Sequence, residues 1–536
     1  MSEPAIWLVE INAPRPGLPV VMPIPEMAMG GPTLAPDLPV PELSAAPVLR
    51  LVDRRWVREP GDAAAPTSPY LVRLATPPII ARQLPIYPDE ERRAAYNEAE
   101  LELLNADGAL AELEGDWRLA GASVVLRRGP QRRPLHAPFS AFERVTELRV
   151  SEAPSGSTTL QLPLSSAAAD LSGALCATFG GTGGADGPAG LTGQARQEVF
   201  GYVRNVATIL TDGALGIWSV HPRAIQQIVA ARDRALALTP IGNVASRAAL
   251  AAAQTPATGQ YLTCLASGDI RTGGGVQGLT VDVRGDVGAG GYGGGSPARI
   301  AVQILRGPGG ISTDRALEAA FASWPTDEAG MVIRDGSVAD ALSRLAAGIY
   351  AWWDADAFGA FRGGIVAPPE SMVPTVLLDE RVLAGPPEPT GAARAPWWRA
   401  TVGYQALDAV QATDSMLAAV TAADRAYYSQ ASRTAAAADV ALRQFYPLAE
   451  DGPEVAGVLE AQAAAAAVAA RIIAVCGKPR GEWRAPLRSG DLLAQLPPGA
   501  CARVLWRRRP AFAAGRNLLV RSVDGEGERP ELVLWG

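Results

Sequence analysis

The sequence predicts a mainly β protein with α+β insertions, built from barrel-like β domains and accompanied by alanine-rich helices. Glycine and proline account for 56 and 45 of the 536 residues, which favours many turns and argues against a helical bundle. Short apolar segments recur at intervals of roughly 8–12 residues, a spacing typical of barrels and sandwiches. Two alanine-rich stretches, 414–446 and 453–475, have the propensity to form helices. The length corresponds to about three or four domains.

Residues 1–92 are rich in proline, with five prolines between Pro14 and Pro25 and more up to Pro47. Proline lacks a backbone N–H and has a fixed φ, so central strands and helices are disfavoured here. We expect a Pro-rich N-terminal arm or edge region with a few strands, and a flexible linker is the alternative.

Two β-rich domains are expected next, a first barrel-like domain over 93–195 and a second domain over 196–297. The segment 93–105 is compatible with helix or strand. Glycine-rich loops occur at 180–194 and 285–297, and the latter is either a mobile loop or a hinge. Neither loop has the context of a phosphate-binding or dinucleotide-binding motif. The expected strands are 117–119, 123–126, 144–150, 158–164, 199–203, 216–220, 261–265 and 279–283, with one helix at 244–254.

The segment 298–396 is predicted to be an α+β module. Helices are expected at 298–305 and 313–322, and Ser337 is a suitable N-cap for a further helix with an apolar stripe. A strand follows at 358–365. Residues 397–536 are predicted to form a helix-containing C-terminal β domain. It begins with a strand at 397–406, continues through the two alanine-rich helices, the second long and continuous over 455–475, and ends with strands at 481–486, 502–506, 517–523 and 531–535.

The composition disfavours several classes of function. The net charge of −7 argues against a broad nucleic-acid-binding surface, which needs excess positive charge. The two histidines, His136 and His221, leave little material for histidine-based catalysis or metal binding. Motifs such as HExxH, GxSxG and the P-loop are missing, and none of the four cysteines forms a CxxC pair. We therefore expect no enzyme activity, no catalytic residue, no cofactor and no metal. A membrane span is not expected either, and the chain is expected to fold in a reducing cytoplasm. The cysteines, expected in the core, are Cys176, Cys264, Cys476 and Cys501.

Few polar residues suggest chemistry. The carboxylates Asp354 and Asp356 follow two tryptophans, as in a glycosidase-like site, but a helix-to-strand turn explains them as well. His221 precedes a proline at a strand end and is expected to be a turn residue. The basic run 507–509 fits a solvated hairpin tip better than a nucleic-acid contact. Glu198 and the pair Asp379 and Glu380 indicate nothing specific.

Two tryptophan pairs are the candidate interface residues. Adjacent residues on a strand face opposite sides, so one ring of each pair is expected in the core and the other where a partner could cover it. The pairs are Trp352 with Trp353 and Trp397 with Trp398.

A series of phrases occurs in a fixed order along the chain. The phrases include LELLNADGALAEL (101–113), GTGGADGPAGLTGQ (181–194), VFGYVRNV (199–206), IWSVHPRAIQQI (217–228), ATGQYLTCLASGDIRTG (257–273), GSVADALSRLAAGIYAWWDADAFGAFRGG (336–364), WWRATVGYQ (397–405) and LVLWG (532–536). Together they resemble the tail proteins of long-tailed bacteriophages and prophages of GC-rich proteobacteria, within the baseplate hub or tail-tip hub class. The resemblance covers roughly residues 95–536 and excludes the Pro-rich start.

The resemblance implies tube-like β-barrel hub domains and a structural role in the virion, with no family catalytic residues to carry over. Such hubs form a homotrimeric ring that closes the distal end of the tail tube, and they contact tube proteins, the tape measure protein and a central fibre or tip. Phage DNA passes transiently through their channel. Two alternatives remain, a receptor- or carbohydrate-binding tail component that uses the tryptophans as stacking platforms, and a tail-associated cell-wall hydrolase that uses Asp354.

Overall fold

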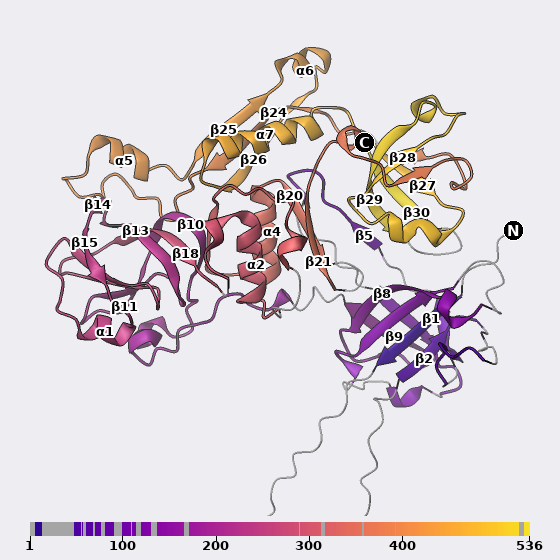
Figure 1. Cartoon of the computed structure of the whole chain (residues 1–536), viewed down its shortest axis with the longest axis horizontal. Coiled ribbons are helices and arrows are strands. Elements are labelled where there is room, and N and C mark those ends of the chain that lie inside the picture. Colours follow the sequence, from indigo (N-terminus) through magenta and orange to yellow (C-terminus); the bar gives the residue numbers. More distant parts are fainter. Residues whose placement is uncertain are drawn as a thin grey trace, which may run out of the picture.

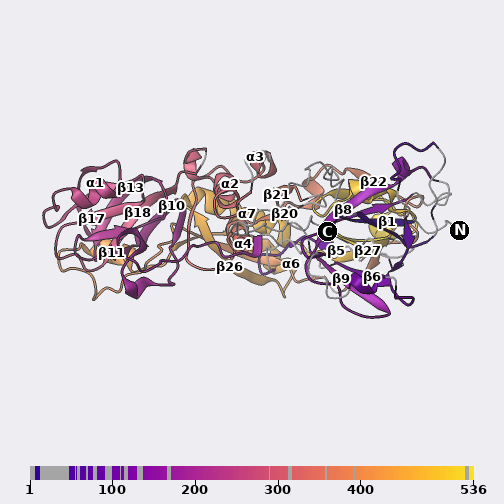
Figure 2. The same ribbon diagram turned by 90° about the horizontal axis from the view of Figure 1, so that it is seen from below.

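The computed structural model describes residues 6–12, 48–54, 56, 61–67, 70–76, 81–90, 99–108, 110–113, 119–129, 137–165, 171–288, 290–311, 317–355, 359–391, 393–524 and 530–536. The chain is elongated (Figures 1 and 2). A β barrel and the C-terminal β domain lie at one end, a second β domain lies at the other, and helices occupy the middle. The described part is mainly β, as the sequence predicts.

The N-terminal domain is an eight-stranded sheet that closes on itself. Its two outer strands are consecutive in the chain and are separated only by Arg73. The Arg73 N–H donates to the Val52 carbonyl (3.2 Å), and its carbonyl accepts from the Leu104 N–H (2.7 Å), so the same short segment bonds to both edges. Closure removes the exposed edges of the sheet. The strand order is β3 (Leu71–Val72), β2 (Val48–Val52), β1 (Trp7–Asn12), β7 (Ser123–Arg128), β8 (Glu143–Val150), β9 (Thr159–Ser165), β6 (Ala99–Leu104) and β4 (Leu74–Thr76).

This sheet crosses the expected boundary at residue 92. The strands β1 and β2 come from the Pro-rich region, yet β1 pairs with β7 over six residues. The alternating apolar side chains of β1, including Val9 and Ile11, are buried in the barrel core. The strands β1 to β4 of the Pro-rich region therefore belong to the first β domain.

The second β domain consists of two five-stranded sheets around a shared core. Its core side chains include Val206 and Val281 from one sheet and Trp218 and Ile270 from the other. One sheet has the order β14 (Leu236–Ala237), β13 (Ile225–Asp233), β18 (Leu279–Asp286), β10 (Glu198–Ala207) and β19 (Gly330–Ile333). The other has the order β11 (Ile209–Asp212), β12 (Ile217–Ser219), β17 (Asp269–Thr272), β16 (Gln260–Cys264) and β15 (Thr239–Asn243), and helix α1 (Arg247–Ala252) packs on it through Leu250.

The middle of the molecule contains helices α2 (Pro297–Arg306), α3 (Leu317–Ala320) and α4 (Val338–Gly348), and the hairpin β20 (Ala351–Ala355) and β21 (Phe361–Ile365). Ser337 caps α4 as expected. Its side chain accepts from the Asp340 N–H (3.1 Å), and the Asp340 carboxylate accepts from the Ser337 N–H (2.9 Å). This reciprocal capping box satisfies two backbone donors at the start of the helix.

A three-stranded sheet lies above these helices in Figure 1, in the order β25 (Arg433–Ala438), β24 (Trp397–Tyr404) and β26 (Glu450–Leu459). Helix α7 (Gln462–Cys476) covers one of its faces, while α5 (Ala422–Tyr428) and α6 (Val440–Phe445) lie in its connections. The side chains of α2, α4, α7 and this sheet form one continuous core.

The expectation of helix across 414–446 and from residue 455 is wrong in part. The segment RTAAAA forms β25, and residues 450–459 form β26, so the long helix begins only at Gln462. The central strand β24 offers a hydrogen-bond partner on both sides. The helix preference of alanine is worth at most ~0.7 kcal/mol per residue, which pairing and packing against α7 override.

The C-terminal domain is a β sheet that recruits strands from three parts of the chain. Leu84 and Ile86, which follow β5, enter the central core, and Trp535 donates from its Nε1 to the Tyr87 hydroxyl (3.1 Å). The strand order is β22 (Val376–Leu378), β28 (Cys501–Val504), β29 (Arg516–Asp524), β30 (Glu531–Trp535), β27 (Glu482–Pro486) and β23 (Glu388–Pro389), with β5 (Ala81–Gln83) pairing with β29.

In the part of the chain that the structure describes, no helix combines the length and apolarity needed to cross a bilayer.

Candidate functional site

Four exposed large apolar side chains of the described chain gather at one projecting point. Residues 439–449, here called the α6 tip, connect β25 to β26 and project at the top of Figure 1. Phe445 is 79% exposed and Leu448 is 83% exposed, and Val440 and Tyr446 are exposed beside them. Single exposed apolar residues are common, but a cluster on one projection is typical of an interaction site.

Several contacts hold the α6 tip in this position. The Asp439 side chain caps α6 by accepting from the Ala441 N–H (3.1 Å), and its own N–H donates to the Trp398 carbonyl (2.8 Å). The Arg443 guanidinium lies over the Trp398 ring, 5.2 Å from its centroid. The tip is anchored to the sheet by these groups, while its large apolar side chains point away from the core.

The sheet below the tip is also incompletely covered. Within the described residues, neither β25 nor β26 has a further strand beyond it. The side chains of Thr434, Ala436 and Ala438 on β25 are exposed, whereas Ala435 is buried. Strand β26 is irregular, because its register against β24 shifts at three places. The tip and the exposed side chains of β25 form one continuous candidate interface.

The structure places the two tryptophan pairs partly as expected. Trp353 and Trp397 are buried in the central core, while Trp352 and Trp398 are half-buried. The Trp352 ring packs near Gly364 and Gly499, and the Arg362 guanidinium lies 5.6 Å from its centroid. The outer rings are therefore already partly covered by this chain. The interface role of the pairs remains a proposal.

Sequence reasoning did not predict that His221 and Glu198 form a largely buried polar cluster with Arg223 and Asp286. Glu198 lies on β10, Asp286 lies on β18, and His221 and Arg223 lie in the connection between β12 and β13. The Arg223 guanidinium donates two hydrogen bonds to the Glu198 carboxylate, at 2.9 and 2.7 Å. The His221 side chain has no exposed surface.

The hydrogen bonds of His221 define what it can do. The Val199 N–H donates to Nδ1 (3.0 Å), so Nδ1 carries no proton and Nε2 is the donor toward the Asp286 carboxylate (3.2 Å). Both ring nitrogens are used within the protein. Catalysis on a substrate needs one of them free, so the geometry supports a structural role, holding β10 against β18.

The two carboxylates of the cluster respond differently to the same surroundings. Burial is the main cause that raises the pKa of Glu198, and the charge of the Arg223 guanidinium and its hydrogen bonds only partly offset it. Burial also acts to raise the pKa of Asp286, but the hydrogen bond from His221 and the charge of Arg223 outweigh it and lower the pKa.

The remaining candidate residues have local roles. Asp354 accepts from Arg362 (2.7 Å), while its predicted companion Asp356 and His136 lie outside the described residues. Asp379 accepts from the Arg381 N–H (2.9 Å), and Glu380 accepts from the Arg507 N–H (3.2 Å). All four cysteine side chains are buried, and none of them forms a disulfide. Within the described ranges, no cluster of His, Cys, Asp or Glu has a metal-binding arrangement.

The sequence interpretation missed the α6 tip. A signal was present, since Phe445, Tyr446 and Leu448 surround Pro447 inside a segment otherwise dominated by alanine. Large apolar residues around a helix-breaking proline indicate a loop whose apolar side chains need a cover.

Comparison with known proteins finds no matching family model and no matching curated protein. Among solved structures, the 43 kDa tail protein of prophage MuSo2 from Shewanella oneidensis aligns at 11% identity over 86% of this chain and 92% of that chain, with a TM-score of 0.35. A tail protein from Neisseria meningitidis MC58 aligns at 10% identity over 86% and 91%, with a TM-score of 0.38. A chain from the virion of a native gene transfer agent particle aligns at 14% identity over 64% and 84%, with a TM-score of 0.42. At these low TM-scores we transfer no residue role from them.

Proposed function

We propose that this chain is a structural virion protein of a phage-type tail, the baseplate or tail-tip hub that closes the distal end of the tail tube. The observation that carries the proposal is the exposed α6 tip above a sheet of which α7 covers only one face. Such a surface in an elongated β protein needs neighbouring subunits. The ordered phrases over residues 95–536, which resemble those of phage tail hub proteins, support the assignment to a tail assembly. We propose no catalytic role.

In this proposal the chain forms a homotrimeric ring. The ring contacts tube proteins on one side and a central fibre or tip on the other, and the tape measure protein and DNA pass through its channel. A net charge of −7 is compatible with such a channel, since an acidic lining does not retain phosphate groups. The protein is made in the host cytoplasm and ends in the virion, at the tail tip.

The test is immunogold labelling of purified tails with an antibody against the barrel, because the α6 tip is expected to be covered by a neighbour in the assembly. Label at the distal end, together with a trimer in mass photometry of the purified chain or its tail subassembly, is the expected result. Absence of the chain from purified particles would refute the proposal. Label along the whole tube would still support a role in the tail, but it would refute the proposed position as the hub at the distal end.

The two alternatives have less support. A stacking platform for a carbohydrate needs exposed adjacent rings, but Trp353 and Trp397 are buried. A hydrolase that uses Asp354 needs a carboxylate free for a substrate, but this one is paired with Arg362.

A further inference from the structure

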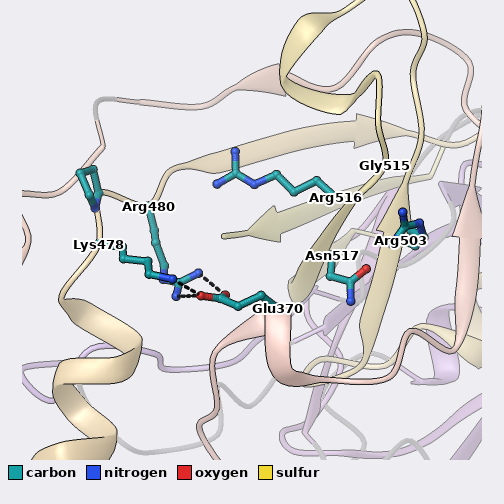
Figure 3. Close-up of a pocket in the computed structure, with 8 residues that line it drawn as sticks. Glu370, Lys478, Arg480, Arg503, Gly515, Arg516 and Asn517 are labelled. Carbon is teal, nitrogen blue, oxygen red and sulfur yellow. Dashed lines mark hydrogen bonds and ion pairs between the residues drawn. The ribbon is translucent and has the colours of Figure 1, made fainter.

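A cleft of about 440 Å³ lies between the end of α7 and the C-terminal sheet (Figure 3), and none of its lining residues belongs to the α6 tip. It is lined by cationic side chains from three separate elements. Lys478 and Arg480 follow α7, Arg503 lies on β28, and Arg516 begins β29. Lys478 is the single lysine of the chain. The volume falls within the range of small-molecule sites in proteins.

Glu370 is the only carboxylate among the lining residues, and it is already used. Arg480 donates two hydrogen bonds to it, each 2.9 Å, and Lys478 donates a third (2.7 Å). Burial acts to raise the pKa of Glu370, but these bonds lower it to about 2, so it remains ionised. Four cations face one carboxylate, which leaves three positive charges uncompensated in a chain that is acidic as a whole.

Arg516 is the cation of the cleft that is most affected by the excess of positive charge. In Figure 3 its side chain extends toward the side of the cleft where Arg480 and Glu370 lie, and no line joins it to another residue. Burial, followed by repulsion from Arg480, lowers the pKa of Arg516. A partly buried guanidinium beside another cation is stabilised by an anion that bonds to its fork of N–H groups.

Asn517 adds a second requirement. Its Nδ2 donates to the Met372 carbonyl (3.1 Å), while its Oδ1 is buried without a hydrogen-bond partner. A buried acceptor without a donor is costly. Since Asn517 lines the same cleft between Glu370 and Arg503, a ligand that fits must carry a donor as well as an anion.

We propose that this cleft binds an acidic saccharide, a sugar that carries a phosphate or carboxylate group. The anionic group bonds to Arg516 and the neighbouring cations, and a sugar hydroxyl donates to the Asn517 Oδ1. This site is independent of the proposed hub function, and it differs from the tryptophan platforms considered for carbohydrate binding.

The test is isothermal titration calorimetry of the full chain at low salt with five probes: glucose 6-phosphate, glucuronate, inorganic phosphate, glucose and a hexaglutamate peptide. We expect one or both acidic sugars to bind about tenfold more tightly than inorganic phosphate, because a sugar has hydroxyl donors separate from its anionic group, whereas the P–OH of inorganic phosphate is part of that group. The stronger of the two identifies the source of the charge. Raised ionic strength should weaken the binding.

Arg516→Gln should weaken binding of the acidic sugar by about tenfold to a hundredfold, the range for one charge-assisted hydrogen bond. Arg508→Gln is the matched control, since Arg508 is exposed on the same domain and does not line the cleft. Equal binding of glucose, equal binding of inorganic phosphate, or an unchanged affinity in Arg516→Gln would each overturn the proposal. Binding of hexaglutamate without binding of either sugar would also overturn it and would assign the cleft to an acidic protein segment.

Discussion

Replacing Phe445 and Leu448 by glutamate should abolish assembly through the α6 tip. Complete burial of a large apolar side chain is worth about 1.5–3 kcal/mol relative to full exposure. Phe445 is 79% exposed and Leu448 is 83% exposed, so roughly four-fifths of that gain is still available to a partner. This amounts to about 2 kcal/mol for each residue and about 4 kcal/mol for the pair, or roughly a thousandfold in the dissociation constant.

The assay is sedimentation velocity of the purified chain over a concentration series, together with the fraction of the chain that copurifies with particles. Gln444→Glu is the control for the Phe445→Glu charge, because it adds one negative charge at the adjacent exposed position of α6 without removing an apolar side chain. Circular dichroism should be unchanged in all variants, since these side chains are exposed. Assembly of the double variant at wild-type concentrations would refute the argument that the tip is an interface.

Three further predictions concern stability. His221→Ala leaves the buried Val199 N–H without a partner and leaves the Asp286 carboxylate with only the longer bond from Arg223 (3.4 Å), so it should cost about 2–4 kcal/mol; hydrogen exchange should accelerate in β10 and β18 but not in the barrel, and unchanged protection of β10 would contradict this. Because folding lowers the pKa of Glu370 from 4.5 to about 2, its contribution to stability is complete above pH 4.5 and is lost as the pH falls through about 2. The difference in melting temperature between wild type and Glu370→Gln should therefore shrink from pH 6 to pH 2, and a constant difference would count against it. Ser337→Ala should destabilise α4 by about 1 kcal/mol in urea titration, whereas Ser337→Thr keeps the cap; equal effects of the two would reject the capping argument.

Local signals predicted the elements that local interactions stabilise. The short apolar run of β7 and the alternating buried residues of β8 indicate strands, and the structure contains them. The Ser337 hydroxyl before an apolar helical stripe indicates the start of α4, and the capping box confirms it. These elements were predictable because their periodicity and caps involve residues only a few positions apart.

Propensity failed where a neighbouring strand competed with it. The alanines of β25 favour a helix in isolation, but they pair with β24 in six consecutive positions. Strand β5 lies more than 400 residues from β29, its partner in the C-terminal sheet. No local sequence pattern predicts either strand pairing, because the hydrogen bonds that stabilise it come from residues distant in the chain.

The sequence by itself determined the mainly β class and supplied the ordered phrases that resemble phage tail proteins. Only the tertiary structure decided which polar residues meet. It joined Glu198 and Asp286 around His221, and it gathered Arg480 and Arg516 into one cleft. Burial and the closeness of charges determine what such groups do, and both depend on distances in space that the order of residues does not contain.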